Sequence, residues 1–162
     1  MNYELIVFDW DGTLMNSEAR IVTCLRRAAE DVGFAVPSVA ASRDIIGLGL
    51  DEAMARLFPG VDAAGQEALV EAYRGHWLGD AIEPSPMFEG ARELVAGLRE
   101  AGLMLAIATG KSRRGLEHVL GDFGLEHLFD ATRCADETHS KPHPLMLEEI
   151  LTDLDTPPEL AL

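Results

Sequence analysis

The stretch that decides the fold runs from residue 3 to residue 13 and reads Tyr-Glu-Leu-Ile-Val-Phe-Asp-Trp-Asp-Gly-Thr. Residues 3–8 form a largely continuous apolar run rather than an alternating one, which is typical of a parallel strand covered on both faces. Gly12 permits the sharp turn that carries the chain off the sheet. Ligands of open α/β sheets bind beyond the carboxyl ends of the strands. Asp9 and Asp11 are therefore the first candidates for a functional site.

The rest of the chain divides into an all-helical block and a block in which helices and strands alternate. The expected helices are 17–32, 50–58, 62–78, 89–101, 112–122 and 142–154, and the further strands are 103–108 and 129–134. Residues 83–86, Glu-Pro-Ser-Pro, read as a linker. The sequence predicts the α/β class, with a Rossmann-like parallel-sheet core at 1–14 and 83–162 and a helical cap inserted at 15–82.

Composition narrows the classes of partner. The chain has 162 residues, a net charge of −15 and 48% hydrophobic residues. This charge argues against nucleic acid and anionic membrane surfaces as partners. Cys24 and Cys134 lack metal-site spacing, and two buried thiols in a reducing compartment are expected. The N-terminal apolar run is too short to span a bilayer and lacks a basic leader, so the cytoplasm is the expected location.

Two further segments follow predicted strands and are expected to converge with Asp9 and Asp11. Thr109-Gly110 follows the second strand, and Lys141 comes after the third. One carboxylate could attack while the other moves a proton, which is the pattern of covalent catalysis with an acid/base partner. Thr109 and nearby backbone N–H groups could bind phosphate oxygens, and Lys141 could offset their charge. Mg²⁺ would bind through oxygen ligands, and a phosphoryl-transfer site is predicted.

Three segments of the chain together resemble the first three motifs of the haloacid dehalogenase superfamily. They are Phe-Asp-Trp-Asp-Gly-Thr-Leu at 8–14, Thr-Gly-Lys at 109–111 and Lys-Pro at 141–142. Within that superfamily the chain is similar to phosphoglycolate-phosphatase-like hydrolases, whose helical cap follows the first motif. The resemblance implies a Mg²⁺-dependent phosphatase acting on a small phosphorylated metabolite, such as phosphoglycolate or a sugar phosphate.

The resemblance also implies a role for each matching residue. Asp9 would form the aspartyl-phosphate and ligate Mg²⁺ through its carboxylate. Asp11 would protonate the leaving oxygen, activate water and give its backbone carbonyl to the metal. Trp10, Thr109 and Gly110 would hold the phosphoryl oxygens, and Lys141 would bridge Asp9 and the phosphoryl group.

The chain departs from the family pattern near Leu162, where it ends while approaching a fourth strand. The fourth motif, which supplies another metal-binding carboxylate, is expected to be missing, because Asp153 and Asp155 precede the expected strand. A truncated chain with weak Mg²⁺ binding and poor turnover is therefore expected. The strand at 3–8 is expected to keep an open apolar edge and to allow self-association.

Several alternatives stay open. A phosphomutase shares the same residues, and an inactive fragment or a phosphate-binding module would fit the missing carboxylate. A dehalogenase is disfavoured because it needs no acid at Asp11.

The sequence also indicates where several residues outside the three motifs lie. Gly47-Leu48-Gly49 is either a plain turn or a cap loop facing the site, in which Gly49 or Arg43 could touch substrate. Lys111 is expected to be a solvated neighbour, and Arg20 a helix-surface residue. Packing or surface positions, rather than ligand positions, are expected for a further set: His76, Trp77, Phe88, His139 and His143.

Overall fold

The computed structural model describes residues 3–79 and 82–162. The elements in chain order, with η marking 3-10 helices, are β1 (Leu5–Phe8), α1 (Glu18–Val32), α2 (Val39–Arg43), α3 (Leu50–Leu57), α4 (Ala63–Leu78), α5 (Ala91–Glu100), β2 (Met104–Thr109), α6 (Arg113–Phe123), η1 (Glu126–Leu128), β3 (Ala131–Cys134), α7 (Leu145–Asp153) and η2 (Pro158–Leu160). The predicted α/β class is confirmed.

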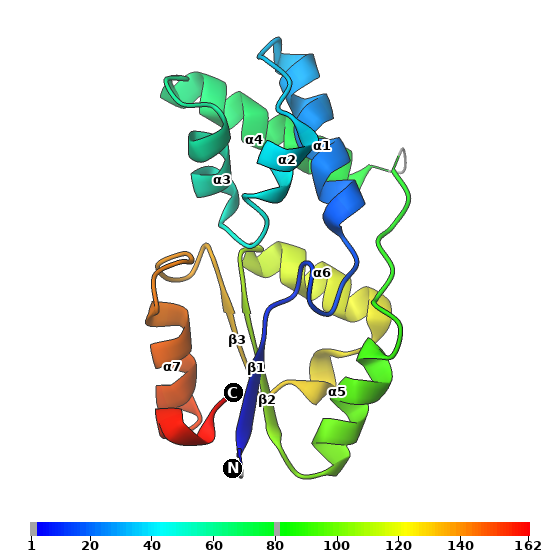
Figure 1. Cartoon of the computed structure of the whole chain (residues 1–162), viewed down its shortest axis with the longest axis vertical. Coiled ribbons are helices and arrows are strands. Elements are labelled where there is room, and N and C mark those ends of the chain that lie inside the picture. The colour runs from blue at the N-terminus through cyan, green and yellow to red at the C-terminus, as the bar shows by residue number, and fades with distance from the viewer. Residues whose placement is uncertain (1–2, 80–81) are drawn as a thin grey trace.

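The strands form one parallel three-stranded sheet in the order β1-β2-β3. Helices α5 and α6 cover one face and α7 the other (Figure 1). Successive residues of β2 face opposite ways: Leu105 and Ile107 pack with α5 and α6, whereas Ala106 and Ala108 pack with α7. The continuous apolar runs of the sequence therefore reflect burial on both faces of the sheet.

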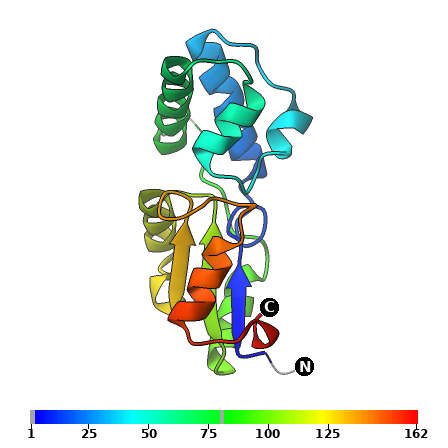
Figure 2. The same ribbon diagram turned by 90° about the vertical axis from the view of Figure 1, so that its left-hand side faces the viewer.

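Helices α1–α4 form a second layer above the carboxyl ends of the strands (Figures 1 and 2). This layer has its own apolar core, which includes Leu25 of α1, Met54 of α3 and Leu69 of α4. Gly33 ends α1 in the left-handed conformation, with φ 80°. The boundary expected at residue 82 falls beside residues 80 and 81, which lie outside the described residues, so the exact limits of the cap stay a prediction.

Helix α7 begins later than the sequence indicated. It starts at Leu145 with Pro144 at the N-cap, so the expectation that Pro142 lies in its first turn is wrong. Residues 135–144 instead form the loop that carries Lys141. The predicted start at residue 142 was wrong because Pro142 and Pro144 both suit the start of a helix. Only tertiary contacts decide between them.

The edge of β1 that faces away from β2 is partly covered. The N–H of Val7 donates to the carbonyl of Leu162 at 2.7 Å, and the N–H of Leu162 donates to the carbonyl of Leu5 at 3.0 Å. A parallel bridge joins Leu5 and Ala161. The expectation of an open edge is therefore wrong along Leu5 and Val7, because residues 160–162 pair there. Self-association through β1 stays a prediction.

Cys24 and Cys134 are both free and fully buried, as the sequence indicated. Burial raises the pKa of the Cys24 thiol to about 11 and that of Cys134 to about 12. Among the described residues, no helix is long and apolar enough to cross a membrane.

Candidate active site

The sheet brings Asp9 and Lys141 together across 132 positions of sequence. Asp9 follows β1, and Lys141 stands in the loop between β3 and α7. The Nζ of Lys141 donates to the Oδ1 of Asp9 at 2.8 Å. The two side chains are 28% and 29% exposed, so water and substrate can still reach them. The predicted convergence of these two residues is confirmed.

Two side chains hold Asp11 in the crevice at the carboxyl ends of the strands, where Asp9 and Lys141 meet. Its Oδ1 accepts a hydrogen bond from the Ser17 hydroxyl at 2.7 Å, and its Oδ2 lies 3.1 Å from the Nζ of Lys111. Ser17 is buried where the chain leaves the core for the cap. These contacts fix the orientation of the Asp11 carboxylate relative to Ser17, at the start of the cap.

The expectation that Lys111 is a solvated neighbour of the site is wrong. Its side chain is only 10% exposed and forms an ion pair with Asp11, whose side chain is 11% exposed. Lys111 comes two residues after Thr109, the last residue of β2, and its side chain reaches Asp11 in the crevice. That position was visible in the sequence, but the direction of the side chain was not.

The predicted phosphate-binding residues occupy the same edge of the sheet. Thr109 is fully buried, and its Oγ1 accepts the N–H of Lys111 at 3.2 Å. The Trp10 side chain is fully buried in the core, so Trp10 could contact a phosphate held beside Asp9 only through its main chain. A Cβ added to Gly110 would lie 2.3 Å from the carbonyl oxygen of Leu48. Only glycine therefore fits where the cap meets the end of β2.

The loop Gly47-Leu48-Gly49 faces the site, as one of its two interpretations proposed. The N–H of Gly49 donates to the Ser140 hydroxyl at 2.8 Å, one residue before Lys141. A Cβ on Gly47 would stand 3.9 Å from the Oδ2 of Asp9. The loop is also the connection between α2 and α3, so both interpretations hold together.

Arg43 lies elsewhere. Its Nε pairs with Glu18 at 2.7 Å, and its side chain is 56% exposed. It does not line the cavity above the crevice, so its proposed contact with substrate has no support in the structure.

A cavity of about 840 Å³ lies between the cap and the core, and Asp11, Gly110 and Lys111 are in its wall. Its cap side is mainly apolar and aromatic, and includes Ile21, Leu25, Ile45, Ile46, Leu48, Leu50, Tyr73, Trp77 and Leu78. The pKa of Tyr73 is raised, first by burial and then by the negative charge of Asp11. The acid/base candidate therefore faces an apolar wall contributed by the cap.

Trp77 connects this wall to the core. Its ring stacks on Tyr73 with centroids 6.0 Å apart, and the Nζ of Lys111 lies 4.3 Å from its centroid. The Arg20 guanidinium lies 4.7 Å from the same centroid and donates to the Trp77 carbonyl. Arg20 is thus engaged at the cap–core boundary, and its expected place on the helix surface is wrong. Attraction between cations and aromatic faces gives a physical reason for both contacts.

The loop that carries Lys141 is braced at its start by Glu137. This carboxylate accepts hydrogen bonds from the Arg113 guanidinium, at 2.7 Å from both Nε and Nη2, and from the Cys134 N–H at 3.0 Å. The hydrogen bond from Arg113 is the main reason that the pKa of Glu137 is lowered. These contacts tie the end of β3 to the first turn of α6.

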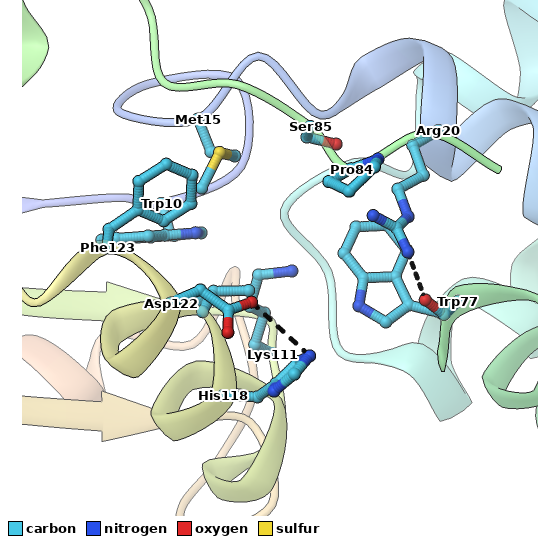
Figure 3. Close-up of a pocket in the computed structure, with 11 residues that line it drawn as sticks. Trp10, Met15, Arg20, Trp77, Pro84, Ser85, Lys111, His118, Asp122 and Phe123 are labelled. Carbon is cyan, nitrogen blue, oxygen red and sulfur yellow. Dashed lines mark hydrogen bonds and ion pairs between the residues drawn. The ribbon is translucent and has the colours of Figure 1, made fainter. Parts of the chain in front are cut away.

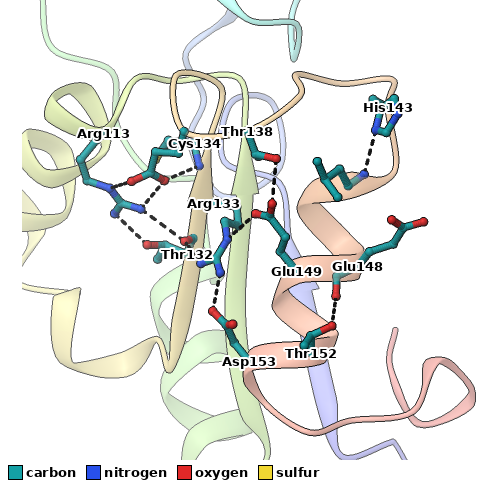
Figure 4. A network of polar contacts seen from close by, with 12 residues as sticks. Arg113, Thr132, Arg133, Cys134, Thr138, His143, Glu148, Glu149, Thr152 and Asp153 are labelled. Carbon is teal, nitrogen blue, oxygen red and sulfur yellow. Dashed lines mark hydrogen bonds and ion pairs between the residues drawn. The ribbon is translucent and has the colours of Figure 1, made fainter.

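The oxygen ligands available for Mg²⁺ are the Asp9 carboxylate and the main-chain carbonyl of Asp11. Within residues 3–79 and 82–162, no group of three or more His, Cys, Asp or Glu side chains could hold a metal. The Asp153 carboxylate is not one of these ligands, because it forms an ion pair with Arg133. Arg133 also binds Glu149, beside β3 and α7 (Figure 4). Mg²⁺ commonly binds one or two carboxylates and completes its shell with water and substrate phosphate. The donors present fit that mode.

The fold and the site define a parallel α/β core with a helical cap and an aspartate, Asp9, directly after β1. The model of the haloacid dehalogenase-like hydrolase family matches residues 6–162, and the chain belongs to that family.

Known proteins share this arrangement to different extents. The chain is 30% identical to phosphoglycolate phosphatase of Vibrio cholerae over 91% of this chain and 69% of that protein. It is 33% identical to the tyrosine-protein kinase PtkA of Mycobacterium tuberculosis over 85% of this chain. The chain spans about half of that kinase, 46% of its length. A haloacid dehalogenase-like hydrolase of Bacteroides fragilis superposes with a TM-score of 0.86 at 26% identity, covering 99% of this chain and 77% of that one.

Proposed function

We propose that the protein is a phosphatase that hydrolyses a small phosphomonoester through an aspartyl-phosphate on Asp9. The observation that carries this proposal is the pair of Asp9 and Lys141 at 2.8 Å, at the carboxyl end of a parallel sheet. A carboxylate nucleophile beside a fixed cation suits attack on an anionic phosphoryl group. The name of the Vibrio cholerae relative supports the same class of reaction.

The reaction divides into two displacements. In the first, an Asp9 oxygen bonds to phosphorus, the ester P–O bond breaks, and Asp11 gives a proton to the leaving alcohol. In the second, Asp11 takes a proton from water, which attacks phosphorus and releases inorganic phosphate from Asp9. Main-chain N–H groups near Trp10 and Gly110, with the Thr109 hydroxyl, would hold the phosphoryl oxygens.

Asp9 and the carbonyl of Asp11 would hold Mg²⁺, which supplies positive charge to a protein whose net charge is −15. Lys141 supplies a second positive charge at the nucleophile. The cap loop Gly47-Leu48-Gly49 lies over the crevice and would exclude bulk water from the reacting groups once substrate is bound.

The identity of the substrate depends on the cap. Phosphoglycolate is one candidate because of the Vibrio cholerae relative, but a cavity of about 840 Å³ also has room for larger esters. Phosphoryl transfer to an acceptor other than water is the second candidate, supported by the identity of 33% with a protein-tyrosine kinase.

The test is release of inorganic phosphate from p-nitrophenyl phosphate with and without Mg²⁺, followed by a panel of small phosphomonoesters. Asp9→Asn should abolish release because the neutral amide is a poor nucleophile. Asp44→Asn is the matched control, since Asp44 is exposed at the end of α2. Activity retained by Asp9→Asn would refute the mechanism. Transfer of phosphate to tyrosine without its release would favour the second candidate.

A further inference from the structure

Three buried polar atoms in different parts of the chain lack a hydrogen-bond partner among the residues that the structure describes. They are the Nε1 of Trp10, the Nε of Arg20 and the Oγ of Ser85. Most buried polar groups in proteins are paired, so each exception calls for an explanation. All three residues line one small cavity of about 40 Å³ (Figure 3), and neither Asp9 nor Lys141 is in its wall.

The cavity lies where the cap joins the core. Trp10 belongs to the loop after β1, Arg20 to α1 and Ser85 to the linker that returns from the cap. Trp77 and Lys111 also line it, and the same two residues line the large cavity. Figure 3 shows Trp10 on one side of the gap and Arg20 with Trp77 on the other. Anything bound here would contact the core, the cap and the linker at once.

The polar groups around this cavity are mainly donors. The indole N–H and the guanidinium Nε–H can only donate, and the Lys111 ammonium carries three donors and no acceptor. The carboxylate in the wall, Asp122, is already within 3.6 Å of the Nε2 of His118. The site therefore calls for an occupant that accepts several hydrogen bonds.

The volume of the cavity and the charges around it distinguish between the two simplest occupants, a water molecule and an oxyanion. A single water molecule needs only about 10–15 Å³ of such space, and it brings two hydrogens that would need acceptors. An oxyanion brings acceptors alone, and its charge suits Arg20 and Lys111. In a protein with a net charge of −15, two cations that meet at a partly closed cavity offer an anion a favourable environment.

We propose that this cavity is a second, non-catalytic site that binds a free small oxyanion of the phosphate or sulfate class and fastens the cap to the core. Trp10, Arg20 and Ser85 donate to its oxygens. Lys111 contributes charge while it keeps its ion pair with Asp11. The ion is a ligand and undergoes no reaction there.

Intrinsic fluorescence measures occupancy directly, because Trp10 and Trp77 are the two tryptophans of the chain and both line the cavity. The probe is sodium sulfate, titrated at constant ionic strength with sodium gluconate, whose anion is too large to enter. A saturable change in emission is expected. Ser85→Ala removes the hydroxyl donor and Arg20→Lys removes the Nε–H donor, so each should weaken the apparent affinity about five- to ten-fold. Arg27→Lys, an exposed change on the same helix as Arg20, should leave it unchanged.

Sulfate could also bind in the catalytic crevice, so a further variant separates the two places. Lys141→Met removes the cation beside Asp9 and should leave the fluorescence titration as in the parent protein. The proposal is overturned if sulfate produces no saturable change, or if Ser85→Ala and Arg20→Lys bind it as tightly as the parent. It is equally overturned if Lys141→Met abolishes the change, because the ion would then lie beside Asp9. Circular dichroism confirms that each variant is folded.

Discussion

Replacement of Gly110 by alanine should separate the cap from the core. The added Cβ would lie 2.3 Å from the carbonyl oxygen of Leu48, 2.6 Å from that of Gly47 and 2.7 Å from the carbonyl carbon of Leu48. These are main-chain atoms, so no change of side-chain rotamer relieves the overlap. An ordinary contact requires a displacement of about 1 Å, and overpacking that is not relieved costs about 1–3 kcal/mol.

The cap loop is the part that should move. Gly110 follows β2, which is buried between two helical layers, whereas the loop is fastened to the core by the hydrogen bond from Gly49 to Ser140 at 2.8 Å. Breaking that bond costs about 0.5–1.5 kcal/mol, so the free energy of unfolding should fall by only about 1–2 kcal/mol. A misplacement of about 1 Å near reacting groups can cost about 10²-fold in rate. Activity should therefore fall much more than stability.

The assay combines phosphatase kinetics, urea unfolding and amide hydrogen exchange. Gly110→Ala should lower kcat/KM about 10²-fold and speed exchange at the Gly49 amide, while the cap and the sheet keep their helical and strand content. Gly97→Ala in α5 is the matched control, since its new Cβ meets nothing within 4 Å, and it should gain up to about 1 kcal/mol from helix propensity. If Gly110→Ala keeps kcat/KM within about two-fold and normal exchange at Gly49, the reasoning about this contact is wrong.

Three further changes test other contacts. Lys111→Met should lower kcat/KM about ten-fold through loss of the charged contact with Asp11 at 3.1 Å, and Lys111→Arg should restore part of it, as steady-state kinetics would reveal. Ser112→Ala should cost about 1 kcal/mol in urea unfolding, because the Ser112 side chain caps α6 at the Gly115 N–H; an unchanged midpoint would contradict this. The raised pKa values of Cys24, about 11, and Cys134, about 12, imply stability that is complete below about pH 9 and lost at higher pH, because the unfolded thiols release protons first. Urea midpoints of the parent should fall from pH 9 to 11 more steeply than those of Cys134→Ala, and parallel curves would refute the assignment.

Local pattern was enough to predict most of the secondary structure. The apolar runs at 3–8 and 103–108 correspond to β1 and β2, and Ser112 caps α6 as its position indicated. Such features depend on neighbours in sequence, since side-chain periodicity and capping involve residues only a few positions apart. The start of α7 was predicted wrongly because two prolines competed for the same role.

The candidate site was only partly predictable. Asp9, Asp11 and Thr109 could be named because they lie at the ends of predicted parallel strands, and Lys141 because it follows the next strand after a short loop. Such ends share one edge of a sheet. The approach of Lys111 to Asp11, the contacts of Trp77 with Arg20 and Lys111, and the fit of Leu48 over Gly110 could not. These contacts depend on how the cap docks on the core.

By itself, the sequence predicted the class of fold from the strand pattern and the family from the resemblance of three motifs, and it named Asp9 as the candidate nucleophile. Tertiary structure alone decided which cation meets which carboxylate, that residues 160–162 cover part of β1, and that three unpaired polar atoms share one cavity. The physical reason is that side-chain direction and close packing depend on contacts between segments that are distant in sequence. A local sequence pattern does not indicate how close such segments come in space.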